Sequence, residues 1–181
     1  MKIGEQKITI YCAGFVIIMF VWLVVCAGEL SALSILRFSL LIMLSYIAMA
    51  FDINTKRIPN ELVLLMIAGW LILIVPAIIF DTRNGIRLLT DSIYGLIVGG
   101  GLFLLVYLIS RKGLGGGDVK FMAAAGLYLG ISKTIPAIFY GTILAAIVGF
   151  VLILLKKIGR KDSIPLVPFL FIGIMITVFT G

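Results

Sequence analysis

Long apolar runs separated by short polar segments make up most of the chain. A helix that crosses the roughly 30 Å hydrocarbon layer of a bilayer needs about 20 apolar residues. On that measure the sequence predicts transmembrane helices at residues 8–27, 38–51, 62–80, 93–109, 119–131, 135–155 and 164–179. The second and fifth runs are short, so we expect them to extend past their charged ends, to be partly embedded, or to fuse with a neighbour.

This pattern predicts an all-α, polytopic membrane helix bundle of six or seven transmembrane helices. No repeat and no Ser-, Gln- or Pro-rich linker interrupts it, so we expect residues 1–181 to form a single membrane-embedded domain. The run at 8–27 is long enough to span, and no AxA-like cleavage site follows it, which favours a membrane helix over a signal peptide. Composition agrees, because 62% hydrophobic and 13% charged residues are too apolar for a soluble domain.

The net charge of +7 is distributed in short clusters between the apolar runs, which argues against nucleic-acid binding and for membrane topology. With seven spans and the N-terminus inside, the internal loops carry Lys2, Lys7, Lys56, Arg57, Arg111, Lys112, Lys156, Lys157, Arg160 and Lys161. The outer loops then carry only Arg37, Arg83, Arg87 and Lys133. By the positive-inside rule, the loops after the second span and before the fifth are both cytoplasmic.

Several kinds of chemistry are excluded by residue type. The chain has no His, which removes Ser-His-Asp and Cys-His catalysis and His-liganded metals. Cys12 and Cys26 lie in the first apolar run without CxxC spacing, so we interpret them as packing or lipid-facing residues. We therefore expect no metal and no other cofactor.

Two of the eight acidic residues have unusual positions. Asp52 directly follows an apolar run and Asp118 directly precedes one, so both are expected at the cytoplasmic boundary of the bilayer, where ionisable groups are functional candidates. Glu61, just after Pro59-Asn60, fits the first turn of a helix. The others are expected in solvated tails or loops: Glu5, Glu29, Asp81, Asp91 and Asp162.

The segment GLGGGD, residues 113–118, precedes the fifth apolar run. We expect its glycines to be too numerous to begin a helix, and to allow open or left-handed backbone that a substrate chain can approach. Asp118 alone also fits a helix N-cap. A phosphate-binding loop fits poorly, because the spacing is not GxxxxGK[ST]. Farther along, small residues are interpreted as helix-packing positions: Gly95, Gly99, Gly100, Gly101, Ala123, Ala124, Ala125 and Gly126.

The pair of aspartates indicates a specific chemistry. Two carboxylates held close together share a proton, so the ionised one can take a proton from water while the protonated one polarises a carbonyl. This is the chemistry of aspartic proteases. Because Asp118 begins a predicted helix, the helix dipole favours its ionised form, which leaves Asp52 as the proton carrier.

Three motifs occur in order along the chain. The first is DINTKRIPN, residues 52–60, an aspartate followed by a basic stretch and a turn containing Pro59 and Asn60. The second is a GxGDxK pattern formed by Gly115, Gly117, Asp118 and Lys120. The third is IPLVPFLFIG, residues 164–173, a Pro-x-x-Pro-Phe-Leu segment with Pro165 and Pro168.

Together these motifs resemble those of the type IV prepilin peptidases, which belong with the GxGD membrane aspartic proteases. Val167 departs from the family pattern, in which Gly or Ala is common at that place. The resemblance implies that Asp52 and Asp118 form the catalytic dyad, with no cofactor. Lys120 is expected either to tune this dyad by pairing or to reach the lipid headgroups.

The resemblance also implies an enzyme of the prokaryotic cytoplasmic membrane that removes short basic leaders from pilin-like precursors at the cytoplasmic face, typically after a Gly. Its partners would be these precursors and membrane lipids, and not nucleic acid. Long members carry an N-terminal region with paired CxxC motifs and an N-methylating activity; this sequence shows no such cysteines, so it resembles the short, peptidase-only branch. Alternatives are a presenilin-like intramembrane protease and a transporter or scaffold that uses the aspartates for protons or cations.

Overall fold

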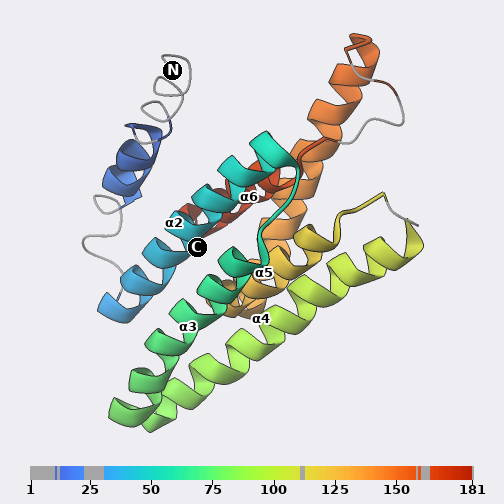
Figure 1. Ribbon diagram of the computed structural model, residues 1–181. Coiled ribbons are helices and arrows are strands. Elements are labelled where there is room, and N and C mark those ends of the chain that lie inside the picture. The colour runs from blue at the N-terminus through green and yellow to red at the C-terminus, as the bar shows by residue number, and fades with distance from the viewer. Residues whose placement is uncertain are drawn as a thin grey trace.

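The computed structural model describes residues 11, 13–22, 31–110, 113–157, 159 and 164–180. The regular elements in this part of the chain are all helices (Figure 1). They are a helix at Ala13–Trp22, α2 (Ala32–Thr55), α3 (Asn60–Phe80), α4 (Thr82–Ile109), α5 (Gly116–Leu154) and α6 (Val167–Thr180). Four of them, α2 to α5, are long and apolar enough to cross a membrane. The prediction of an all-α, polytopic membrane helix bundle is confirmed.

The two short predicted spans are both longer in the structure than in the hydropathy pattern. The second, predicted at 38–51, extends past its charged ends into the 24 residues of α2. The fifth and sixth, predicted at 119–131 and 135–155, fuse into α5, which is broken at Gly130, where φ is 69° and ψ is 176°. The chain changes direction sharply at this break (Figure 1).

Some predictions fall on residues outside the described part of the chain. Of the first predicted span, the structure describes Tyr11 and the helix Ala13–Trp22. The predictions for the following residues lie outside the described residues: Lys2, Glu5, Lys7, Cys12, Cys26, Glu29, Arg111, Lys112, Arg160, Lys161 and Asp162.

Three charges predicted to lie in outer loops lie inside helices instead. Arg37 is in α2, Asp91 is in α4, and Lys133 is in α5. The Nε and Nη1 atoms of Arg37 are buried. A prediction from hydropathy places the end of a span at a charged residue. In the folded bundle, residues on other helices pack around these charges, so the helices continue past them. Arg83 and Arg87 likewise belong to the first turns of α4.

The turn between α2 and α3 is short and well defined. Lys56 ends α2 in a left-handed conformation, with φ of 51°, and its N–H donates to the carbonyl of Asp52 at 2.8 Å. Pro59 then precedes α3, whose first turn contains Glu61, as predicted. This turn keeps the last residues of α2 beside the first residues of α3.

Glycine packing joins α4 to the first half of α5. A Cβ atom at Gly95 would overlap the carbonyl oxygen of Gly126, and one at Gly99 would lie 2.5 Å from the carbonyl oxygen of Met122. Only glycine allows backbones to approach so closely in these positions. The interpretation as packing positions is confirmed for Gly95, Gly99, Gly100 and Gly126, but it is wrong for Gly101, where a Cβ atom would meet nothing within 4 Å.

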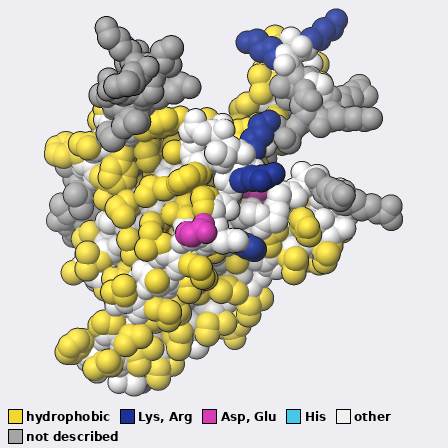
Figure 2. Space-filling model, viewed as in Figure 1, with side chains coloured by type: hydrophobic (Ala, Val, Ile, Leu, Met, Phe, Trp, Pro, Cys, Tyr) yellow, Lys and Arg dark blue, Asp and Glu magenta, His cyan; other side chains and the backbone are white. Residues whose placement is uncertain are grey.

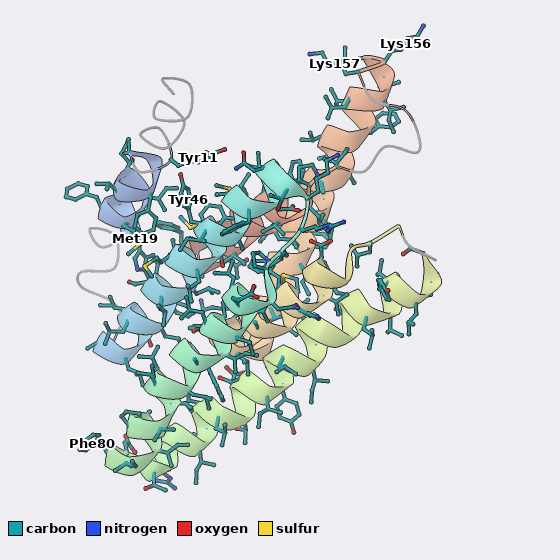
Figure 3. The ribbon with its side chains drawn as sticks, in the orientation of Figure 1. Tyr11, Met19, Tyr46, Phe80, Lys156 and Lys157 are labelled. Carbon is teal, nitrogen blue, oxygen red and sulfur yellow. The ribbon has the colours of Figure 1, made fainter. Side chains whose placement is uncertain are left out.

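The two ends of the bundle differ in charge. Lys156 and Lys157, just after α5, stand at one end, and Phe80, the last residue of α3, lies at the other (Figure 3). The Lys and Arg side chains visible in Figure 2 gather toward the end with the two lysines, and apolar side chains cover most of the remainder of that face. Apolar exposure is extreme at Phe80, which is 88% exposed. Such a surface suits lipid and not water.

Candidate active site

Asp52 lies in the last turn of α2 and is only 5% exposed. Its Oδ2 atom accepts a hydrogen bond from the backbone N–H of Val167 at 3.0 Å, and the backbone amide of Leu166 interacts with the same carboxyl group. Both amides belong to the first turn region of α6, where N–H groups have no partner within their own helix. Asp52 therefore caps α6 from another helix.

The two prolines of the C-terminal motif explain why these amides are available. Pro165 and Pro168 carry no N–H, so the only backbone donors between them are Leu166 and Val167. The fixed φ of proline also restricts this segment before the helix begins. The motif thus directs both of its remaining amides to Asp52.

Asp118 is the third residue of α5 and is half-buried. Its Oδ2 atom accepts a hydrogen bond from the N–H of Gly115 at 3.2 Å. The prediction that GLGGGD cannot begin a helix is wrong, since α5 starts at Gly116. A left-handed backbone is also absent at Gly115, where φ is −76° and ψ is 139°. The first turn tolerates glycine here because the carboxylate of Asp118 caps it.

Gly117 allows the two motif-bearing loops to meet. A Cβ atom at this position would lie 3.3 Å from the Cβ of Ile58, which belongs to the turn between α2 and α3. By contrast, a Cβ atom at the neighbouring Gly116 would meet nothing within 4 Å. The function of Gly117 that the structure shows is therefore close packing against Ile58.

A second contact joins the same two motifs. Lys120 donates from Nζ to Oδ1 of Asn60 at 3.0 Å, and both side chains are exposed. Of the two expectations for Lys120, the structure shows pairing, although with Asn60 and not with an aspartate. Pro59 sets the extended backbone before α3, with φ of −61°, and so positions Asn60 at the helix start.

The structure brings Asp52 and Asp118 to one cavity of about 250 Å³. The other residues that line it are Lys56, Arg57, Ile58, Gly115, Gly116 and Gly117. Lys56, Arg57 and Ile58 were predicted as parts of the DINTKRIPN motif and, for the two cations, as topology signals, but not as site residues. Their place one turn or more after Asp52, in the same motif, is the signal that could have identified them as site residues.

This arrangement suits acid–base chemistry on a bound backbone carbonyl. A cavity of this size has room for water, and two carboxyl groups lining one cavity can divide the functions of acid and base between them. Within the described part of the chain, no group of three or more His, Cys, Asp or Glu side chains could hold a metal ion. The polar groups that line the cavity are the carboxyl groups of Asp52 and Asp118, the cationic side chains of Lys56 and Arg57, and the backbone of the glycine segment.

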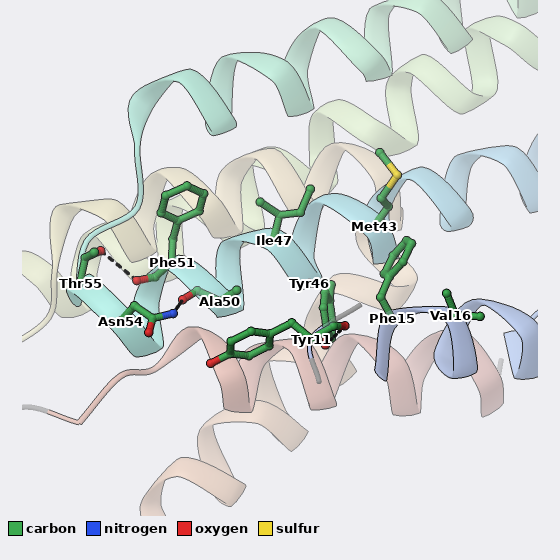
Figure 4. A pocket seen from close by; sticks show the side chains of 10 residues that line it. All are labelled: Tyr11, Phe15, Val16, Met43, Tyr46, Ile47, Ala50, Phe51, Asn54 and Thr55. Carbon is green, nitrogen blue, oxygen red and sulfur yellow. Dashed lines mark hydrogen bonds between the residues drawn. The ribbon is translucent and has the colours of Figure 1, made fainter. Parts of the chain in front are cut away.

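A larger cavity of about 670 Å³ lies between the helix Ala13–Trp22 and α2 (Figure 4). Its walls are mainly aromatic and aliphatic, and the polar groups of Asn54 and Thr55 are turned back onto α2, to the carbonyls of Ala50 and Phe51. No acidic side chain lines it. It therefore supplies an apolar surface but no catalytic group.

Comparison with known proteins identifies a family. The type IV leader peptidase family matches residues 38–150, which is more than half of the chain. Similar proteins include the prepilin leader peptidase/N-methyltransferase of Escherichia coli (strain K12), 29% identical over 69% of this chain and 54% of that protein. The protein of the same name from Bacillus subtilis (strain 168) is 30% identical over 50% of this chain and 38% of that protein. The one from Aeromonas hydrophila is 28% identical over 75% of this chain and 46% of that protein.

The chain spans about half the length of these relatives. No solved structure gives a significant match. The family match contains both motif aspartates and the turn and glycine segments that pack against each other around the cavity. The chain belongs to the type IV leader peptidase family.

Proposed function

We propose that this protein is a membrane aspartic endopeptidase that removes short basic leader peptides from type IV pilin-like precursors at the cytoplasmic face of the membrane. The observation that carries the proposal is the cavity that Asp52 and Asp118 share. The names of the similar proteins, prepilin leader peptidases, support the choice of substrate class. The proposal assigns catalysis to the two aspartates and needs no cofactor.

In this mechanism the two carboxyl groups share one proton. The backbone amides of Val167 and Leu166, at the positive end of the α6 dipole, stabilise the ionised form of Asp52, which acts as the base that takes a proton from water. Asp118 carries the proton and polarises the scissile carbonyl, which reverses the assignment expected from the dipole of its own helix alone. Water adds to that carbonyl, and the proton then passes to the leaving nitrogen as the peptide bond breaks.

The basic residues support the proposed orientation. Lys56 and Arg57 line the cavity of the aspartates, and Lys156 and Lys157 stand at the end of α5 away from Phe80. By the positive-inside rule this end faces the cytoplasm. A precursor whose apolar helix lies in the same bilayer would then present its leader junction at the level of the cavity.

The test is co-expression of the full chain with a precursor that carries a short basic leader ahead of an apolar helix. The wild-type chain should convert the precursor to the mature form, with mass spectrometry placing the cut at the leader junction. Asp52→Asn and Asp118→Asn should each abolish conversion while the protein still inserts. Asp81→Asn is the matched control, because Asp81 is an exposed residue in the turn before α4.

Three results would overturn the proposal. Robust cleavage by the Asp118→Asn or the Asp52→Asn variant would show that the two aspartates are not the catalytic pair. A cut inside the apolar helix of the precursor would indicate a presenilin-like intramembrane protease. Uncleaved precursor with a fully inserted wild-type chain would indicate a transporter or scaffold that uses the aspartates for protons or cations.

A further inference from the structure

A charged group lies at the break in α5, away from the cavity of the aspartates. At Gly130 the helix is interrupted, and the N–H of Ile131 has no carbonyl partner within a regular helix. Oδ1 of Asp91, on α4 and forty residues earlier in sequence, accepts this N–H at 3.0 Å. Asp91 therefore caps the second half of α5 from a neighbouring helix.

The fit between Asp91 and Gly130 is tight. A Cβ atom at Gly130 would overlap the carboxylate of Asp91, and the positive φ at this position independently favours glycine. Thr134 adds a bond from its hydroxyl to the carbonyl of Gly130 at 2.6 Å. The break is thus specified by contacts on both of its sides.

One cation, Arg37, interacts with this carboxylate. Arg37, on α2, attracts Asp91 electrostatically, and its Nε and Nη1 atoms are buried without a hydrogen-bond partner among the described residues. The guanidinium carbon of Arg37 lies 4.7 Å from the ring centre of Phe38, and Nζ of Lys133 lies 5.7 Å from the same centre. Asp91 on α4 therefore connects α5, through the N–H of Ile131, with α2, through the charge of Arg37.

The break at Gly130 is connected to the cavity by a single straight piece of helix. Residues 118 to 130 cover about 18 Å at the usual rise of about 1.5 Å per residue. Between them, Gly126 packs against Gly95 of α4, and at the far end Gly117 packs against Ile58. These contacts limit sideways movement of the helix, so the position of the break at Gly130 along the helix axis also sets the position of Asp118.

We propose that Asp91 is a positioning residue for the catalytic pair. By capping Ile131 it fixes the break at Gly130, and the first half of α5 then places Asp118 opposite Asp52. The catalytic consequence rests on the proposed function. The effect of Asp91 on the position of the first half of α5 does not depend on that function, and it can be measured without any substrate.

The structural test is a disulfide between positions 58 and 117, in the full chain with Cys12 and Cys26 replaced by Ser. The Cβ of Ile58 and a Cβ built on Gly117 lie 3.3 Å apart, close to the separation of about 3.5–4.5 Å that disulfides require. Ile58→Cys with Gly117→Cys should cross-link readily on mild oxidation. Adding Asp91→Ala should slow this cross-linking at least tenfold, because Ile131 loses its acceptor.

Asp91→Asn is the conservative variant, since its amide oxygen can still accept the N–H of Ile131. It should cross-link within about threefold of the parent. In the chain that retains Ile58 and Gly117, Asp91→Ala should lower kcat at least tenfold with KM within twofold, and Asp91→Asn should restore most of kcat. Asp81→Ala is the matched control: Asp81 also caps a helix, α4, by accepting from Asn84 at 3.2 Å, and should leave both measurements unchanged.

If the Asp91→Ala protein does not accumulate in the membrane, the Asp91→Glu variant provides a second test. It keeps the charge but moves the carboxylate by one methylene, so it should impair cross-linking and kcat more than Asp91→Asn does. Unchanged cross-linking in Asp91→Ala, or better performance by Asp91→Glu than by Asp91→Asn, would overturn the inference. Slowed cross-linking in Asp91→Ala, together with a wild-type chain that cleaves no precursor, would uphold the positioning and refute the proposed function.

Discussion

The backbone N–H of Val167 donates to Oδ2 of Asp52 at 3.0 Å, although 115 residues separate them in sequence. The donor is a main-chain group, so its removal requires proline. We expect Val167→Pro to lower kcat/KM by about tenfold or more, since a hydrogen bond to a charged group is worth about 1.5–3 kcal/mol. Cleavage of the precursor by purified enzyme measures this.

Val167→Ala is the control for that variant. Alanine keeps the N–H and removes only part of a side chain, so activity should stay within a few-fold of wild type. The side chain of Val167 is fully buried, and its shortening should cost stability and not chemistry. Equal losses in the two variants would show that the amide has no particular importance.

Gly117 and Gly116 provide a matched pair in the first turn of α5. Gly117→Val should force Ile58 away, with a cost of about 1–3 kcal/mol for overpacking, and should lower both cleavage and thermal stability. Gly116→Val meets open space and should leave the melting temperature near that of wild type. Thermal unfolding in detergent compares them, and a more stable Gly117→Val protein would contradict the close packing.

Lys120 and Asn60 should contribute modestly. Their hydrogen bond is exposed, so Lys120→Gln and Asn60→Ala should each reduce kcat/KM by less than about tenfold, the net worth of such a bond being about 0.5–1.5 kcal/mol. The double variant should be no worse than the poorer single one, because both remove one interaction. A loss of several orders of magnitude in Lys120→Gln alone would make Lys120 a catalytic group.

The break in α5 should not tolerate a side chain. Gly130→Ala combines the strain of a positive-φ backbone that is essentially restricted to glycine, about 1–3 kcal/mol, with an overlap with Asp91, so the inserted protein should unfold several degrees lower. Gly101→Ala is the comparison, since a Cβ atom there meets nothing within 4 Å and alanine favours helix by about 0.5–1 kcal/mol. Similar melting temperatures for both variants would contradict the need for glycine at the break.

The orientation can be tested with single cysteines in a chain whose Cys12 and Cys26 are replaced by Ser. Lys157→Cys should react with an impermeant maleimide from the cytoplasmic side, and Arg83→Cys from the opposite side. Both positions are exposed, and they belong to the opposite ends marked by Lys157 and Phe80 in Figure 3. The reverse labelling pattern would place the cavity of the aspartates away from the cytoplasm.

Local sequence signals determined most of the helices. A run of about 20 apolar residues can satisfy its backbone in lipid only as a helix, so hydropathy identified α3 and α4 and the approximate extent of α2. The scarcity of acids in apolar surroundings identified Asp52 and Asp118 as candidates. Clusters of glycine and alanine indicated close helix packing, because the absence of a side chain is visible in sequence, whereas the pairing of α4 with α5 came from the structure.

The misplaced charges show the limit of such signals. Three charged residues were assigned to loops from the sequence, because a charge in lipid is costly unless a partner lies nearby: Arg37, Asp91 and Lys133. Their neighbours lie on other helices, as Asp91 does for Arg37, and a local pattern does not show them. The start of α5 was misjudged for a related reason. Glycine is costly inside a helix, but here it occupies the first turn, where the carboxylate of Asp118 supplies the cap.

The sequence by itself determined that the chain is a bundle of membrane helices and that two aspartates stand at helix ends, since apolar length and the cost of a charge in lipid are local properties. Only the tertiary structure decided that Asp52 and Asp118 line one cavity, that Val167 donates to Asp52, and that α5 breaks against Asp91. These contacts depend on how helices far apart in sequence rotate and cross, which is set by the packing of all of them together.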